Sequence, residues 1–180
     1  MKPFSEIVTT ASAERQPSSK VVAHPASRMP APALKDMPKA MRTLTQSLTI
    51  SEVVWTGRTA TKMTKLTVPV AEAEAALSIL SQLSSPGELE QIADIVKRIR
   101  NLWPNTSGGN VSVAQDWLRV FIDVPLASLF AAYEHFLRSD REFAPTPGQV
   151  LVKANEHAAF VERKRLEVEA GLANAKRGAA

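Results

Sequence analysis

The chain contains no cysteine, and it has only one tyrosine and seven glycines. Without thiols it can form neither a disulfide nor a thiolate nucleophile, which fits a reducing compartment. No apolar run approaches the roughly 18 residues that a membrane-spanning helix needs. The N-terminus also lacks the basic and then apolar layout of a secretory signal. We therefore expect a soluble, cytoplasmic protein.

Motifs that carry chemistry are missing as well. The three histidines, at positions 24, 135 and 157, include no pair at the i, i+4 spacing of a helical metal site. No serine lies in a nucleophile-elbow context. The run Ser107-Gly108-Gly109 lacks the downstream Gly-Lys-Ser/Thr of a phosphate loop. We predict that the protein is not an enzyme and uses neither a metal nor a cofactor.

Charge is divided unevenly along the chain. Residues 1–66 hold ten basic and four acidic side chains, a net charge of +6, whereas residues 67–180 have a net charge of −2. A basic arm on a slightly acidic body favours an anionic partner for the arm, such as nucleic acid or an acidic protein surface. The alternative is a solvated linker that happens to carry lysines.

The sequence predicts that this arm is largely without structure of its own. Residues 1–33 are rich in Pro, Ser, Ala and Thr, and we expect them to be disordered. Residues 34–48 form a possible short helix that folds against a partner, because apolar residues recur there at helical spacing. The members of this stripe are Leu34, Met37, Met41, Leu44 and Leu48. Residues 50–68 lean towards strand with Gly57 as a turn, but an isolated hairpin is marginal, so we interpret them as linker. Trp55 is predicted to anchor a partner, or else to fold back onto the body.

From residue 67 the pattern is helical. Apolar stripes predict helices over about 70–83, 89–103, 112–121, 126–137 and 147–161. Three of these starts carry a capping-box pattern, at Ser85–Glu88, Ser112–Gln115 and Thr146–Gln149. We predict an all-α fold: a compact bundle of four to five helices at 67–161, a disordered basic arm at 1–66, and a long charged C-terminal helix. Its part at 162–180 would project from the body or pair with another helix.

Basic residues mark two candidate nucleic-acid surfaces. The arm is the stronger candidate, and its binding should be weak, non-specific and dependent on salt because its charges are spread out. A second cluster lies on the helix at 89–103, where a solvated, ion-paired face is the alternative. The candidates are Lys35, Lys39, Arg42, Arg58, Lys62 and Lys65 in the arm, and Lys97, Arg98 and Arg100 on the helix.

One pattern resembles a known family. It consists of Trp117, the break Asp123-Val124-Pro125, a helix ending in the aromatic pair Tyr133 and Phe136, and the turn Phe143-Ala-Pro-Thr-Pro-Gly148. Over roughly residues 88–155 this is similar to the bacteriophage replicative helicase loader and inhibitor family. The resemblance implies an all-helical domain that binds a hexameric replicative helicase and delivers it to an origin complex, without ATPase activity of its own.

The leading hypothesis is therefore a non-catalytic phage or prophage replication accessory protein, a helicase-loader-like adaptor in the cytoplasm of a bacterium or an infected host. Two rivals stay open. One is a nucleic-acid-binding regulator that uses the basic arm on DNA. The other is a helical structural protein of a virion or another assembly, which self-associates through its last helix.

Overall fold

The computed structural model describes residues 29–103, 111–140 and 143–178. Of the residues predicted to be disordered, 1–33, residues 1–28 lie outside this range, as do residues 104–110. The elements, in chain order, are α1 (Met37–Met41), the 3₁₀ helix η1 (Arg42–Thr45), β1 (Thr49–Thr56), β2 (Thr59–Leu66), α2 (Val70–Leu83), α3 (Leu89–Asn101), α4 (Val111–Phe121), α5 (Leu126–Leu137) and α6 (Pro147–Gly178).

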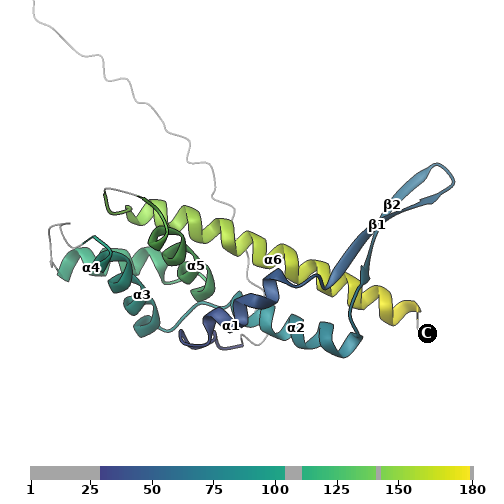
Figure 1. The fold of residues 1–180 in the computed structure, drawn as a ribbon, viewed down its shortest axis with the longest axis horizontal. Helices are drawn as coiled ribbons and strands as arrows, with labels where there is room; N and C mark the ends of the chain where they lie inside the picture. Colours follow the sequence, from purple (N-terminus) through teal and green to yellow (C-terminus); the bar gives the residue numbers. More distant parts are fainter. Residues whose placement is uncertain (1–28, 104–110, 141–142, 179–180) are drawn as a thin grey trace, which may run out of the picture.

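Helix α6 is the axis of the molecule. Its 32 residues span roughly 48 Å at 1.5 Å per residue. Helix α5 packs against its N-terminal half, and α2 and the β1–β2 hairpin pack against its C-terminal half (Figure 1). Helix α3 packs on α5, and α4 contacts both α3 and the N-terminal part of α6. One stripe of α6 is buried along nearly the whole helix, and it consists of Val150, Ala154, Val161, Val168 and Leu172.

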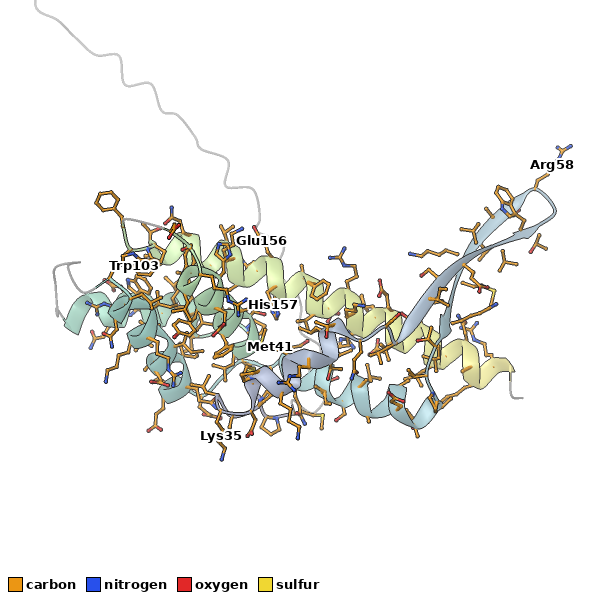
Figure 2. All side chains as sticks on the ribbon, viewed as in Figure 1. Lys35, Met41, Arg58, Trp103, Glu156 and His157 are labelled. Atoms are coloured by element: carbon orange, nitrogen blue, oxygen red, sulfur yellow. The ribbon has the colours of Figure 1, made fainter. Side chains whose placement is uncertain are left out.

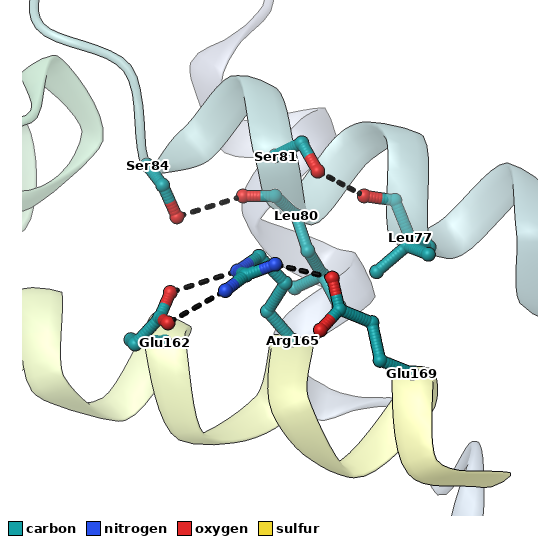
Figure 3. Close-up of polar contacts among 7 residues, drawn as sticks. All are labelled: Leu77, Leu80, Ser81, Ser84, Glu162, Arg165 and Glu169. Carbon is teal, nitrogen blue, oxygen red and sulfur yellow. Dashed lines mark hydrogen bonds and ion pairs between the residues drawn. The ribbon is translucent and has the colours of Figure 1, made fainter. Parts of the chain in front are cut away.

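The charged part of α6 after residue 161 belongs to the packed body. There the buried stripe continues past Arg165, whose guanidinium makes ion pairs with Glu162, one turn before it, and with Glu169, one turn after it (Figure 3). These bonds lower the pKa of Glu162 and raise that of Arg165, because each partner favours the charged form of the other. The charge of Arg165 is therefore balanced where α6 faces α2. This part of α6 packs on the body and does not project from it.

The segment at 34–48 also belongs to the hydrophobic core. Met37, Leu44 and Leu48 are buried in the same cluster as the α2, α5 and α6 side chains, and Leu34 and Met41 pack against its edge. The predicted helix is only partly present, since α1 and η1 together span residues 37–45 and Leu34 and Leu48 lie outside them. The partner for these apolar residues is the protein's own body. The hydrophobic effect acts on the apolar area that leaves water, whichever part of a chain covers it.

The prediction of an all-α fold is wrong, because β1 and β2 form a two-stranded antiparallel sheet and the fold is mixed α and β. The strand and turn signals at 50–68 did not by themselves predict a sheet, since a lone hairpin is marginal in water. Here the hairpin has support from outside itself, because its base packs on α6. Tertiary contact stabilises the strands that local propensity leaves undecided.

Helix starts were predicted with mixed success. The box at the start of α6 is confirmed: the Thr146 amide donates to Gln149 Oε1 at 3.0 Å, and the Gln149 amide donates to Thr146 Oγ1 at 3.3 Å. The box at Ser85 is wrong, because α3 begins three residues later with Glu88 as its N-cap. The Ser85 hydroxyl instead donates to the Met29 carbonyl at 2.6 Å, which ties the incoming chain to the end of α2. The Ser112 box involves side chains outside the described set.

Candidate interaction surfaces

The hairpin is fixed to the body only at its base. A side chain at Gly171 of α6 would lie 2.8 Å from Leu66 Cδ2 and 3.4 Å from Thr49 Cγ2, so the glycine lets the first strand pair approach the helix closely. One turn later the Asn174 side-chain amide donates to the Thr64 carbonyl at 2.9 Å. Beyond these contacts the ribbon extends away from the helices, with its turn clear of the body (Figure 1).

A two-residue loop closes the hairpin. Thr56 pairs with Thr59, which leaves Gly57 and Arg58 as the loop residues. Gly57 has a φ of 63°, the conformation that two-residue hairpin turns demand at their first position and that glycine adopts without strain. Arg58 is thereby placed at the far tip of the ribbon (Figure 2). The two-residue turn sets the register of the two strands, from the pair Thr56–Thr59 to the pair Thr49–Leu66.

Large apolar side chains on the outer half of the ribbon are bare. Trp55 is 70% exposed and Val53 is 60% exposed. The register pairs Trp55 with Ala60 and Val53 with Lys62, so these four residues share one face of the ribbon. Ala60 is too small to cover the indole across the strands. An exposed tryptophan without a packing partner is typical of a binding surface, since burial of its ring is a large source of free energy.

The outer half of the ribbon is also purely basic. Glu52 is the only acidic residue of the hairpin, and it makes an ion pair with Lys65 near the base. Residues 53–64 contain Arg58 and Lys62 and no carboxylate. Within the described part of the chain, neither cation has an ion-pair partner, so both charges are free to meet an external anion.

The structure divides the residues predicted to bind a partner into two groups. Leu34, Met37, Met41, Leu44 and Leu48 line the inside of the protein or its edge, where they pack against the body. Trp55 alone points into solvent. The apolar stripe of residues 34–48 thus belongs to the core, whereas Trp55 belongs to the surface.

The predicted nucleic-acid residues do not form one patch. Lys35, Lys39 and Arg42 lie around α1, the three hairpin cations lie on the projecting ribbon, and Lys97, Arg98 and Arg100 lie on α3. Lys35 and Arg58 are far apart in the molecule (Figure 2). On α3 the Arg98 guanidinium is held by Asp94 at 2.8 Å. Among the predicted nucleic-acid residues, those of the hairpin lie beside a mostly exposed aromatic ring, that of Trp55.

A second bare aromatic lies at the other end of the molecule. Phe143 precedes α6 and is 72% exposed, the most exposed large apolar side chain among the described residues. The turn behind it is rigid, because Pro145 is buried and the Thr146–Gln149 box fixes the helix start. The sequence prediction used Phe143 as part of a motif but did not select it as a contact. Its position outside every apolar stripe was the available signal.

One polar pair, with Ser128 buried and His157 half-buried, joins α5 to α6. His157 Nδ1 lies 3.2 Å from the Ser128 hydroxyl, on the face where the two helices pack (Figure 2). Burial lowers the pKa of His157, because it disfavours the charged form of the ring. The hydrogen bond to Ser128 is part of the packing of the two helices. The described residues contain no cluster of three or more His, Cys, Asp or Glu side chains that could hold a metal ion.

Comparison of the chain with family models, curated proteins and solved structures finds no match. In the part of the chain that the structure describes, every helix is too short or too polar to cross a lipid bilayer. The two exposed aromatic sites, on the hairpin and before α6, are therefore the features from which a function can be argued.

Proposed function

We propose that this protein is a non-catalytic accessory factor of phage or prophage DNA replication, an adaptor that binds a replicative helicase in the bacterial cytoplasm. The observation that carries the proposal is the bare phenyl ring of Phe143 on a rigid turn. The resemblance to helicase loaders over roughly residues 88–155 supports it, since Phe143 belongs to the motif on which that resemblance depends. The partner class comes from the resemblance, and the contact point comes from the geometry.

The turn suits a protein contact because little order must be gained on binding. A partner that covers Phe143 buries a large apolar surface, and the backbone behind the ring is already fixed by Pro145 and by the start of α6. Preorganisation of this kind reduces the entropy lost in a complex. Aromatic anchors of this type carry a large share of the binding energy in protein interfaces.

Binding alone is sufficient for this role. A protein that occupies a helicase surface changes the activity of that helicase by the difference between its affinities for the active and the inactive state. The packing of α5 on α6, which includes the Ser128–His157 pair, would hold Phe143 in one position relative to the rest of the protein. The partner would then be bound in one orientation. No chemical group of the adaptor needs to react.

Size-exclusion chromatography with light scattering tests the proposal, with the full chain alone and mixed with the replicative helicase of the host. We expect co-elution at a defined stoichiometry and a changed ATPase rate of the helicase. The variant Phe143→Ala should weaken the complex by roughly 30-fold or more, as expected for a hot-spot aromatic worth about 2 kcal/mol.

Leu166→Ala is the matched control, because Leu166 is another exposed apolar side chain but lies on the middle of α6. It should leave the affinity unchanged. Failure of the wild-type chain to co-elute would overturn the proposed partner. Equal weakening by both variants would show that the contact is not at the Phe143 turn.

A further inference from the structure

The hairpin lies at the opposite end of α6 from the Phe143 turn, and it has its own chemistry (Figure 1). We infer that its outer half is a binding site for single-stranded nucleic acid, with Trp55 stacking on a base and with Arg58 and Lys62 pairing with phosphates. This inference does not depend on the helicase proposal, because a different surface carries it.

The first argument is charge. Arg58 and Lys62 are the only charged residues between positions 53 and 64, and the one carboxylate of the ribbon is already paired with Lys65. A surface with two free cations and no anion is complementary to a phosphate backbone. An acidic protein would satisfy the cations too, but it would offer nothing to the indole beside them.

The second argument is the arrangement of the aromatic ring. Trp55 and Lys62 lie on the same face of the ribbon as diagonal neighbours, roughly 7 Å apart in such a register. The ring is open because its cross-strand neighbour is Ala60. A base that stacks on the indole would therefore have a phosphate within reach of Lys62, and Arg58 at the tip could meet the next one. Stacking on an aromatic ring beside cations is the common mode of single-strand recognition.

The third argument is that the ribbon does not suit a protein groove. The apolar side chains are divided between the two faces, with Val53, Trp55 and Ala60 on one and Ile50, Val54 and Met63 on the other, so each face offers only a small apolar patch. Duplex DNA is a poorer fit as well. Groove reading requires several side chains that can form paired hydrogen bonds with base edges. The hairpin offers only Arg58 and two lysines for this purpose, and one of these, Lys65, is already paired with Glu52.

Fluorescence anisotropy of labelled oligothymidylate, about 20 nucleotides long and so longer than one binding site, tests the inference with the full-length protein. A duplex of equal length is measured in parallel. We expect tighter binding to the single strand than to the duplex. Trp55→Ala should raise the Kd by about 5- to 150-fold, the range for loss of one stacked base, and Trp55→Phe should restore most of the affinity.

The double variant Arg58→Ala/Lys62→Ala tests the phosphate contacts. The slope of log K against log salt should fall by about 1.4, which is two contacts at about 0.7 each on a single strand. Arg119→Ala/Arg138→Ala is the charge-matched control, since it removes two exposed arginines from α4 and α5. This control should keep the wild-type slope, and any binding by residues 1–28 contributes equally to every variant.

Three results would overturn the inference. One is the absence of binding to the single strand at about 50 mM salt, where non-specific phosphate contacts are strong. Another is equal loss in the two double variants, which would show an effect of net charge alone. The last is an unchanged Kd for Trp55→Ala. Because none of these measurements contains a helicase, they leave the proposed function to its own test.

Discussion

Residues 34–48 and residues 53–62 look alike as sequence, since both are basic segments with apolar residues and no obvious place in the helical bundle. The structure places them in opposite environments. Met37 and Leu48 are buried in the core, whereas Val53 and Trp55 extend into solvent on the ribbon. The comparison teaches that an apolar pattern identifies side chains that are stabilised by burial. It does not show whether the same chain or another molecule buries them.

The largest expected effect comes from the buried member of this comparison. Met37→Ala should lower the free energy of unfolding by about 2–5 kcal/mol, because it leaves a cavity in the core. Urea denaturation followed by circular dichroism measures this, with Met29→Ala, at an exposed methionine, as the control. If both variants unfold at the wild-type urea concentration, residues 34–48 do not belong to the core.

A substitution at the junction of the two segments should have an intermediate effect. Gly171→Val adds a branched side chain where even a Cβ would lie 2.8 Å from Leu66 Cδ2 and 3.4 Å from Thr49 Cγ2, so the side chains at the base of the hairpin must shift away from α6. We expect a loss of about 1–3 kcal/mol from overpacking, together with faster hydrogen exchange of the hairpin amides. Gly178→Val lies in the same helix in open space, and it should leave the hairpin protected.

A smaller effect is expected in the turn. Gly57→Ala places a Cβ at a positive φ, which costs roughly 1 kcal/mol. Since the ribbon is attached only at its base, this cost should appear as faster exchange near residues 54–61 and hardly at all in the global transition. A matching fall in the melting temperature of the whole protein would mean that hairpin and body unfold as one unit.

The smallest effect on stability is expected at Trp55, on the outer half of the ribbon. Trp55→Ala should change the free energy of unfolding by less than about 0.5 kcal/mol, because the ring is mostly in water already. Thermal unfolding followed by far-ultraviolet circular dichroism measures it. A loss similar to that of Met37→Ala would show that Trp55 is covered by the body, and it would remove the hairpin as a binding site.

Much of the helical part could be predicted from local signals. The bounds of α2 match the predicted range of 70–83, and the Thr146–Gln149 box marks the start of α6 where hydrogen bonds confirm it. Such signals involve residues within one helical turn of each other, so they can be recognised in the sequence without knowledge of the fold. The start of α3 at Leu89 agrees with the predicted range, but its N-cap was misassigned: Ser85, a good cap by pattern, is instead bonded to Met29, 56 positions earlier in the chain.

The hairpin, and the packing of the end of α6 against the body, could not be predicted, because each is stabilised by the other. Two strands alone are marginal, and a helix with the sequence of residues 162–170 looks solvated when its charges are counted singly. Contact between Leu66 and Gly171, together with the Glu162–Arg165–Glu169 ion pairs, resolves both ambiguities at once. No window of a few residues contains that information.

The sequence by itself determined the α2, α5 and α6 helices, the strand and turn tendency around Gly57, and the charge of the ribbon, since these follow from local conformation and composition. Only the tertiary structure decided which apolar residues are core and which are surface. The physical reason is that burial depends on contacts between distant segments, which close loops of many residues and are favourable only as a set. Trp55 and Phe143 became candidate contacts because the folded chain leaves them uncovered.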